Sequence, residues 1–480
     1  MTDRGGMNSV EASPRGKLLG MKVPYLRGSH PFVTLLRSFI GVLQGESDKA
    51  AQVLRGSSTG DWHGCFLQAV EPLIDLICSA GSEALIQLQQ KTKAADPDAL
   101  IAALDLAQTG REVLPMCKRL LQQPQVGRPR LGSSTDRAVG PTTGSSASRQ
   151  SQSHLDGLQE LLAGAAHSSL VGYHEAVLRA ARGSGLGLGL SLGLGGGSSS
   201  GDQAIQDATV HSLTSRTMHL LRRMMEFQPT VDWLLGTNQQ LQAMCTRDYA
   251  RSILRDLVQG LQARAADKPA KDKARAAVPH LFLLNNLHYI SSTIRSGFQE
   301  EHEMQAEGVG GAEQHGLLGG EDAASRSALR QQVGDDLVQV WEHLCEVNKE
   351  TYFEKSWDRL VSSETGFVES VAAEQLQTQR GSKLLTLESG RLLKAKFDGF
   401  NALFEQLHKV FRHCSVPDPT LRVQLISEAT ARVVPPFRAF YEKYRTVQFS
   451  KKNMSKYLRY SPEVVDSMLQ ELFGGVSAQK

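Results

Sequence analysis

Hydrophobic residues along this chain recur at intervals of three or four positions, which is the spacing that predicts amphipathic α-helices. Alternation with a period of two, which is typical of β-strands, is nearly absent. The pattern therefore predicts an all-α protein. The clearest stripes comprise Leu213, Leu220, Met224 and Phe227; Leu254, Leu257, Val258 and Leu261; Leu329, Val333, Leu337, Val340, Trp341 and Leu344; and Phe397, Phe400, Phe404, Leu407 and Phe411.

Two helices near the C-terminus have sequence signals at both ends. Asp418 and Ser461 each precede a proline, and a capping side chain before a proline at the first helical position marks a helix N-terminus. We expect the first helix to end at Pro435–Pro436, because proline lacks a backbone N–H and clashes with the preceding turn. We expect the second, a short amphipathic helix, to close at Gly474–Gly475.

Three segments lack the large aliphatic side chains that a packed core needs, so we expect linkers or surface insertions there. The helices between them have short connections, and this favours a stacked helical rod without a fixed sequence repeat. In chain order, the predicted parts are a disordered leader (1–17), an N-terminal helical part of the rod (18–126), a Ser/Gly/Thr-rich linker (127–154), a helical segment (155–182), a Gly/Leu/Ser low-complexity insertion (183–204), a central helical part (205–300), an acidic Gly-rich loop (301–326) and a C-terminal helical part (327–480).

Cysteine spacing and the lack of long apolar segments favour a cytosolic protein, whereas length and charge limit its domain count and its partners. Its 480 residues allow two to four domains or one elongated assembly, and the net charge of +3 is too small for the whole surface to bind a polyanion. The six cysteines lie far apart and form no CxxC pair, so we expect reduced core thiols. The N-terminus lacks the apolar core of a signal peptide, and the chain has no run of 18 apolar residues. We therefore expect neither secretion nor a membrane span.

Candidate catalytic motifs are weak. Ser191 lies in a GxSxG sequence, but a nucleophile elbow requires a strand before the serine, and here the motif falls in the low-complexity insertion. The chain has no GxxxxGK[ST] loop, no GxGxxG after a strand and no HExxH. We therefore expect no enzymatic activity and no cofactor, with a serine hydrolase as a remote alternative.

Candidate metal ligands are equally weak. His408, His413 and Cys414 lie close together but lack a fourth ligand nearby, so an ordinary helix end is the simpler interpretation. His280 and His288 lie two helical turns apart and are expected in packing or on the surface. Asn453 begins a glycosylation sequon that should stay unmodified in the cytosol.

One segment concentrates positive charge. Residues 441–460 carry six basic side chains and one acidic side chain, Glu442. Lys456 and Arg459 are three residues apart, so one helical turn would present them side by side with the neighbouring tyrosine rings. Such a patch can attract an anionic membrane leaflet, although a solvated helix face is the plainer alternative. Nucleic acid is not expected as a partner, because the rest of the chain does not extend the basic surface.

Several segments, in one order along the chain, resemble the Exo70 subunit family of the exocyst, the complex that tethers secretory vesicles to the plasma membrane. Residues 207–215 (DATVHSLTS) are similar to that family's DGTVHPLT stretch, and residues 280–290 (HLFLLNNLHYI) to its LFLLNNLxYI helix. The segment 456–460 (KYLRY) resembles its KYIKY element. Further similar segments are 352–357, 396–401, 416–422 and 436–440.

The resemblance implies an elongated rod of stacked antiparallel helix pairs without enzymatic activity. It also implies a peripheral protein at the inner face of the plasma membrane, which binds other exocyst subunits and phosphatidylinositol bisphosphate. The implied lipid contacts are Lys456 and Arg459, and Lys451 and Lys452 are added from their charge alone.

Family members usually begin with a long coiled-coil helix, and no heptad stretch precedes residue 30, so either the chain lacks that helix or the gene model starts late. The alternative function is a helical interaction scaffold whose basic tip docks an acidic protein partner, such as a Rho-family small GTPase.

Overall fold

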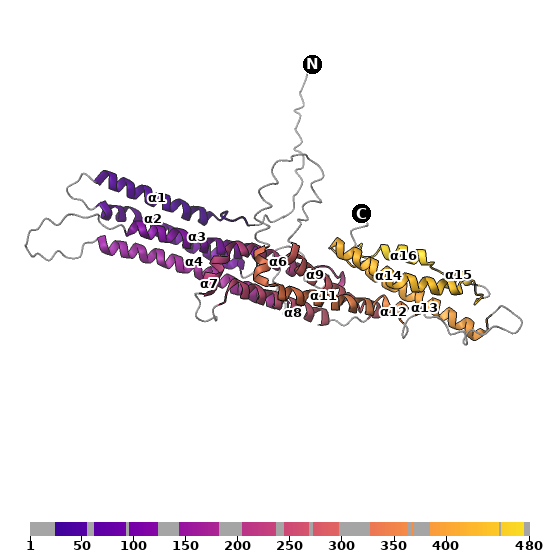
Figure 1. The fold of residues 1–480 in the computed structure, drawn as a ribbon. Helices are drawn as coiled ribbons and strands as arrows, with labels where there is room; N and C mark the ends of the chain where they lie inside the picture. Colours follow the sequence, from indigo (N-terminus) through magenta and orange to yellow (C-terminus); the bar gives the residue numbers. More distant parts are fainter. Residues whose placement is uncertain are drawn as a thin grey trace, which may run out of the picture.

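The helical stripes fold into an elongated rod of α-helices (Figure 1). In this computed structural model, the described residues contain no β-strand, which agrees with the all-α prediction. The hydrophobic stripes predicted at 254–261 and 397–411 are buried. The structure describes residues 25–54, 62–92, 96–122, 144–181, 204–236, 244–267, 272–296, 327–362, 367–368, 385–450 and 453–474.

One end of the rod is a bundle of four helices that share one hydrophobic core. The cap of its third helix is encoded locally, because Asp96 accepts a hydrogen bond from the Asp98 N–H and Pro97 follows it. The helices are α1 (Pro31–Leu54), α2 (Trp62–Thr92), α3 (Pro97–Leu121) and α4 (Gly144–Ala181).

The predicted linker at 127–154 was too long at its C-terminal end, since α4 begins at Gly144. Its first turns contain many serines, which favour turns in isolation. Tertiary contacts override that preference: Ser151 is buried, and the Ser148 hydroxyl donates to the Leu121 carbonyl at 3.0 Å. The helical segment therefore starts about three turns earlier than the composition indicates.

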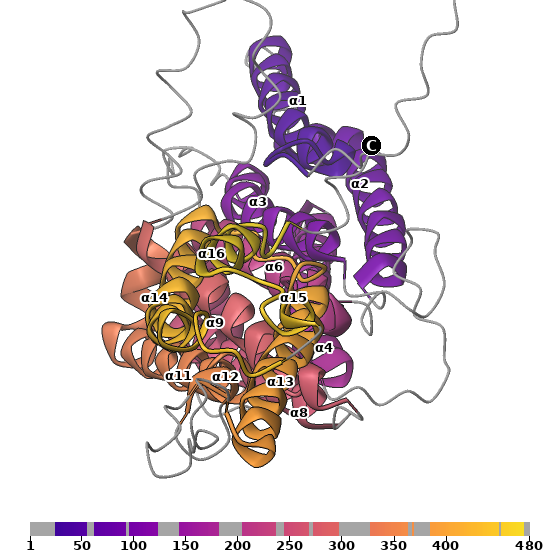
Figure 2. The same ribbon diagram turned by 90° about the vertical axis from the view of Figure 1, so that its right-hand side faces the viewer.

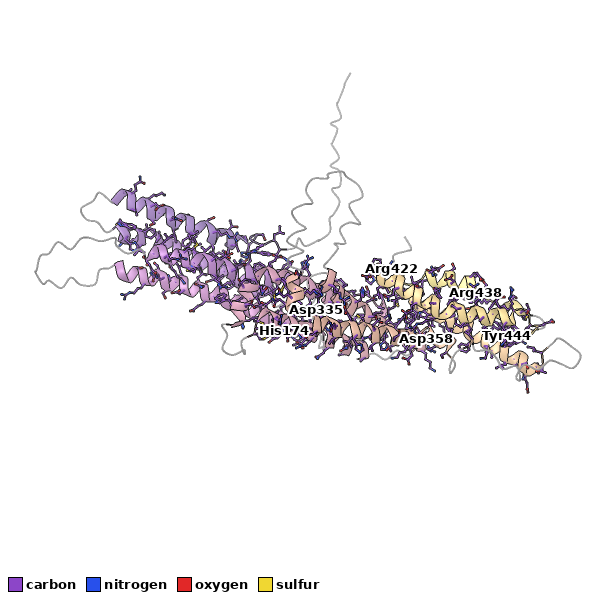
Figure 3. All side chains as sticks on the ribbon, in the orientation of Figure 1. His174, Asp335, Asp358, Arg422, Arg438 and Tyr444 are labelled. Atoms are coloured by element: carbon purple, nitrogen blue, oxygen red, sulfur yellow. The ribbon has the colours of Figure 1, made fainter. Side chains whose placement is uncertain are left out.

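The middle of the rod contains a second set of helices packed on α3 and α4. His174 of α4, labelled in Figure 3, joins the two parts, because its Nε2 lies 2.6 Å from the Asp256 carboxylate of α8. The helices are α6 (Ser212–Met224), the 3-10 turn η1 (Met225–Phe227), α7 (Gln228–Gly236), α8 (Thr246–Asp267), the 3-10 turn η2 (Lys273–Arg275), α9 (Val278–Ser296) and α11 (Asp335–Lys355).

The stripe at 329–344 does not lie on one continuous helix. Gly334 adopts φ = +84°, a left-handed conformation that interrupts the helix between residues 327–333 and α11. Val340 is 53% exposed, whereas Trp341 is buried. The spacing predicted the buried side of both flanks, but it was wrong for Val340 and did not reveal the break at Gly334.

The C-terminal end is assembled around an aromatic core. Phe400 stacks on Phe437 with ring centroids 4.0 Å apart, and Phe397 packs against Phe440 at 4.9 Å. Figure 2 views the rod from this end, with these helices in front. They are α12 (Asp358–Val361), α13 (Leu387–Phe411), α14 (Pro419–Tyr444), α15 (Met454–Tyr457) and α16 (Pro462–Gln470).

The prediction that Pro435–Pro436 ends a helix was wrong, because α14 continues through both prolines to Tyr444. A proline inside a helix costs about 3 kcal/mol or more. The buried stripe continues past the prolines, and Phe437, Phe440 and Tyr444 are each at most 2% exposed. Burying an aromatic side chain contributes roughly 1.5–3 kcal/mol, so together they offset the cost.

Both predicted N-caps of this region are present. The Asp418 side chain accepts from the Leu421 N–H at 2.7 Å, and Ser461 accepts from the Val464 N–H at 3.4 Å. The last helix ends at Gln470, earlier than the predicted close at Gly474. Beyond it, Phe473 takes φ = +63° and donates its N–H to the Phe411 carbonyl, so its buried ring closes the core from outside the helix.

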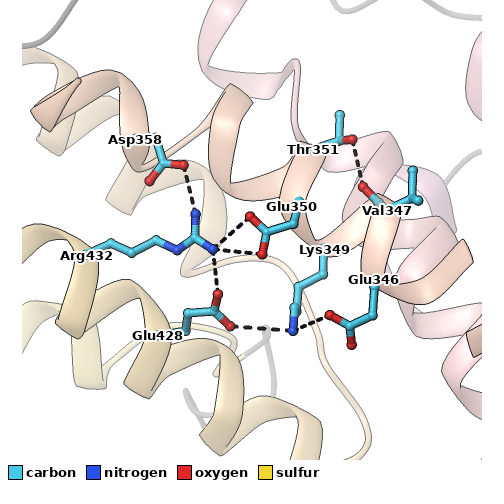
Figure 4. A network of polar contacts seen from close by, with 8 residues as sticks. All are labelled: Glu346, Val347, Lys349, Glu350, Thr351, Asp358, Glu428 and Arg432. Carbon is cyan, nitrogen blue, oxygen red and sulfur yellow. Dashed lines mark hydrogen bonds and ion pairs between the residues drawn. The ribbon is translucent and has the colours of Figure 1, made fainter. Parts of the chain in front are cut away.

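A charged network fixes α14 to α11 and α12 (Figure 4). The Arg432 guanidinium donates to both oxygens of Glu350 at 2.9 Å, to Asp358 at 2.9 Å and to Glu428 at 2.6 Å. Lys349 lies 3.8 Å from Glu428 on the other side. The two terminal nitrogens of one guanidinium thus contact carboxylates of α11, α12 and α14, which positions the C-terminal helices relative to the middle of the rod.

Several predicted segments fall largely or wholly outside the described residues. These are the leader at 1–17, the insertion at 183–204 apart from Ala204, and the loop at 301–326. Ser191 and its GxSxG sequence lie within that insertion and are likewise outside the described part of the chain.

Candidate functional site

The basic segment borders an open groove at the C-terminal end of the rod. One wall comes from α13, and the other from α15 and the residues around it. The groove has a volume of about 680 Å³. Its lining residues are Asp398, Asn401, Ala402, Glu405, Asn453, Ser455, Lys456 and Arg459.

The structure brings Lys456 and Arg459 together in this groove, and both side chains are exposed. The expectation that they share a helical turn was wrong, since α15 ends at Tyr457. Each cation instead lies over the tyrosine that follows it: Lys456 Nζ is 5.8 Å from the Tyr457 ring centroid, and Arg459 Cζ is 5.4 Å from that of Tyr460.

Contacts from α13 and the aromatic core hold this segment in place. The buried Asn401 donates from Nδ2 to the Tyr457 carbonyl at 2.9 Å. The Tyr457 ring lies 6.0 Å from Phe449, and the Tyr460 ring lies 5.9 Å from Phe404. The cations are therefore carried on a segment anchored to the core.

The two cations differ in their electrostatic surroundings. Arg459 donates to Glu405 Oε1 at 2.5 Å, and the Tyr460 hydroxyl donates to the same oxygen at 3.0 Å. Burial, followed by the Glu405 contact, raises the pKa of Tyr460. Lys456 forms no ion pair with any residue that the structure describes. Lys456 is thus available to an anion, whereas Arg459 already has a carboxylate partner.

A third cation, which the sequence did not indicate, lies against the basic segment, although it is not among the residues that line the groove. Lys394 Nζ of α13 lies 5.8 Å from the Tyr457 ring centroid, so Lys394 and Lys456 share one ring. The two lysines are far apart along the chain, and no local spacing connects them. Arg445, near the same end, pairs with Glu442 at 2.6 Å.

Two of the predicted lipid contacts, Lys451 and Lys452, lie outside the described residues.

The histidine and cysteine candidates have ordinary packing roles. The Cys414 thiol is buried, which raises its pKa to about 12, and it donates to the Val410 carbonyl. His413 contacts the Lys409 carbonyl, and burial lowers the pKa of His408. No group of three potential metal ligands occurs in the described part of the chain.

The segments that carry the family resemblance pack against one another. Asn285 of α9 is buried, and its Nδ2 donates to the Ala208 carbonyl at 2.6 Å and to the Ser415 carbonyl at 3.0 Å. One amide therefore ties the 207–215 and 280–290 segments to the chain before α14. A buried amide with these partners fits only one arrangement of the three segments.

Comparison with known proteins identifies the family. The family model for the C-terminal part of the Exo70 protein of the exocyst complex matches residues 29–471, which is most of the chain. This chain belongs to the Exo70 family. The non-enzymatic prediction agrees with that membership, because the Exo70 family consists of exocyst components.

Similar proteins include Exo70 subunits from plants and animals. The chain is 27% identical over 288 residues to the exocyst complex component EXO70A1 of Arabidopsis thaliana, covering 57% of this chain and 37% of that protein. It is 25% identical over 279 residues to the human exocyst complex component 7, covering 56% of this chain and 32% of the relative. The chain thus spans about a third of the length of these relatives.

Among solved structures, the crystal structure of the exocyst component Exo70p of S. cerevisiae is similar, with 14% identity and a TM-score of 0.44. The match covers 92% of this chain and 70% of the yeast chain. Among the helices that the structure describes, none is both long and apolar enough to cross a bilayer.

Proposed function

We propose that this chain serves as an exocyst subunit that tethers secretory vesicles to the plasma membrane, where its C-terminal groove binds phosphoinositide lipid. The observation that carries the proposal is the exposed Lys456, which has no ion-pair partner among the described residues, in a chain of the Exo70 family. The expected location is the inner face of the plasma membrane. Other exocyst subunits are the expected partners of the rod.

The groove suits a phosphorylated headgroup. Lys456 and Arg459 line it, and Asn453 and Ser455 add uncharged polar side chains to the lining. Lys394 lies against the Tyr457 ring, next to Lys456 along the basic segment. Phosphate oxygens accept hydrogen bonds from all of these donor types. The site is thus a combination of charge and directional donors on an anchored segment.

Charge alone is too weak to anchor the protein. About 1 kcal/mol per basic residue near an anionic surface amounts to about 3 kcal/mol for three cations, which corresponds to a dissociation constant weaker than about 1 mM. Hydrogen bonds to the headgroup, or a second membrane contact elsewhere in the complex, must lengthen the residence time. The described helices offer no membrane span that would replace such contacts.

The shape of the rod supports the division of roles. The four-helix bundle α1–α4 lies at one end, and α13 and α15, which carry residues of the groove, lie toward the other (Figure 1). A partner bound along the bundle leaves the groove accessible, so the rod can connect a vesicle-bound complex to the membrane.

Vesicle sedimentation tests the lipid role. We expect Lys456→Glu to weaken binding to vesicles containing phosphatidylinositol bisphosphate by about ten-fold or more, because it replaces attraction with repulsion. The matched control is Arg255→Glu, which makes the same charge change at an exposed position on α8 in the middle of the rod. Binding should also fall as salt rises.

The opposite result would reject lipid binding at this groove. If Lys456→Glu and Arg255→Glu bind vesicles as the unmodified chain does, the groove is not the lipid site. If, in that case, Lys456→Glu lost binding to an acidic protein partner and Arg255→Glu did not, the result would favour the interaction scaffold.

A further inference from the structure

The groove contains its own competitor for an anionic ligand. Glu405 of α13 accepts from Arg459 at 2.5 Å, and its side chain is 36% exposed at the groove wall. A headgroup that uses Arg459 must therefore exchange with a carboxylate that is already in place. The pair is exposed enough to open, because exposed ion pairs contribute only about 0–1 kcal/mol.

Glu405 is held in position from two sides. It projects from the helix whose Asn401 anchors the basic segment, and the Tyr460 hydroxyl donates to the same Oε1 at 3.0 Å. The tyrosine also carries the Arg459 guanidinium over its ring. The carboxylate, the phenol and the guanidinium thus form one preorganised unit.

The charges that line the groove are balanced. Asp398 and Glu405 are two carboxylates, and Lys456 and Arg459 are two cations. A ligand with one negative charge that displaces Glu405 from Arg459 only replaces one ion pair of Arg459 with an equivalent one. The exchange therefore adds little binding free energy. A phosphate monoester carries about −1.5 to −2 charges and three acceptor oxygens, so it can engage Arg459 bidentately and reach Lys456 as well.

We propose that Glu405, by occupying Arg459, makes the groove selective for headgroups that bear phosphate monoesters over lipids with a single negative charge. This inference rests on the proposed lipid function and assigns a specificity-determining residue within it. In the presence of Glu405, a ligand must carry more negative charge to separate Arg459 from its carboxylate partner.

The test compares two vesicle compositions at equal surface charge. One contains phosphatidylserine and the other contains phosphatidylinositol bisphosphate, each in phosphatidylcholine. We expect Glu405→Gln to strengthen binding to the phosphatidylserine vesicles by about five-fold, and to the phosphoinositide vesicles by less than about two-fold. The amide oxygen of glutamine still accepts from Tyr460, and unchanged thermal unfolding verifies that the fold is intact.

Two controls separate this role from a general change of charge. Glu442→Gln removes a carboxylate from the other arginine pair of the same end, Glu442 with Arg445, and we expect it to leave the ratio of the two affinities unchanged. In an Arg459→Gln background, the effect of Glu405→Gln on the ratio should disappear, because no guanidinium remains to be released.

The outcomes distinguish the two proposals. If the unmodified chain binds phosphoinositide vesicles through Lys456 but Glu405→Gln does not lower the selectivity ratio, the role of Glu405 is rejected and the lipid site stands. An equal shift in Glu442→Gln, or persistence of the shift without Arg459, also rejects it. If neither the unmodified chain nor Glu405→Gln binds either vesicle, both proposals fail.

Discussion

Asn286 accepts the backbone N–H of His211 on its Oδ1 at 2.9 Å, which joins α9 to the residue that caps α6. The same oxygen accepts from the Thr214 hydroxyl at 2.7 Å, and Nδ2 donates to the Thr209 carbonyl at 3.3 Å. All of this lies in the core, where Asn286 is 0% exposed. One side chain thus satisfies three polar groups at the start of α6.

We expect Asn286→Ala to lower the free energy of unfolding by about 2–4 kcal/mol, because it leaves a buried N–H and a buried hydroxyl without a partner. Urea titration followed by circular dichroism measures the change. Thr351→Ala serves as the control, since among the described residues the Thr351 hydroxyl bonds only within α11, and its loss should cost well under about 1 kcal/mol. Equal effects of the two substitutions would contradict the role of Asn286.

His211 predicts a pH dependence of stability. Burial, with Arg264 and Arg216 nearby, lowers its pKa from 6.5 to about 4, and its Nδ1 accepts from the Leu213 N–H only when unprotonated. Between pH 6.5 and about 4, His211 is protonated in the unfolded chain but neutral in the folded chain. The contribution of neutral His211 to stability is therefore fully present above pH 6.5, and about 3 kcal/mol of it is lost as the pH falls to 4.

The comparison with His211→Asn isolates this contribution, because asparagine also caps a helix but does not titrate. We expect the free energy of unfolding, measured by urea titration at several pH values, to fall less steeply between pH 6.5 and 4 in the variant. Parallel pH profiles would show that His211 is not responsible, since the remaining histidines are common to both proteins.

Most of the fold was predictable because its information is local. The aromatic stripe of α13 and the caps at Asp418 and Ser461 follow from spacing and from neighbouring residues, and the structure confirms all three. The start of α4 was missed, since Ser151 becomes helical through its burial in the bundle rather than through its own preference. Gly334 breaks a helix that periodicity alone would continue.

The candidate site was predictable only in part. The clustering of Lys456 and Arg459 is visible along the chain, whereas the pairing of Arg459 with Glu405 joins positions from two separate helical regions. Lys394 reaches Tyr457 for the same reason, through the packing of α13 on the basic segment. Contacts between distant segments depend on the tertiary structure, and a single sequence carries no direct signal of them.

The internal prolines of α14 predict a stabilising substitution. Pro435 is exposed, so Pro435→Ala removes no core packing, and it relieves the clash with the preceding turn. Greater freedom of the unfolded chain offsets part of the gain. We expect a net increase of about 1–2 kcal/mol in the free energy of unfolding, measured by urea titration. A decrease would indicate that the backbone of α14 requires proline at this position.

The Arg432 network predicts a loss that a lysine only partly rescues. Arg432→Ala leaves Glu350, Asp358 and Glu428 close together without their shared cation, so we expect a decrease of about 2–4 kcal/mol in the free energy of unfolding. Arg432→Lys keeps the charge, but a single ammonium replaces the two terminal nitrogens that contact Asp358 on one side and Glu350 and Glu428 on the other. Its stability should therefore lie between those of the alanine variant and the unmodified chain. Equal stability of the alanine and lysine variants would show that charge in this network contributes nothing.

Lys394 predicts a lipid contact that charge clustering along the sequence does not reveal. It shares the Tyr457 ring with Lys456, which lines the groove, so its positive charge adds to the attraction for an anionic headgroup there. We expect Lys394→Glu to weaken binding to vesicles containing phosphatidylinositol bisphosphate by about ten-fold, as for Lys456→Glu. The matched substitution Arg255→Glu on α8 should have little effect in the same sedimentation assay. If Lys394→Glu binds like Arg255→Glu while Lys456→Glu is impaired, the headgroup lies on the Arg459 side of the ring and Lys394 serves only to pack Tyr457.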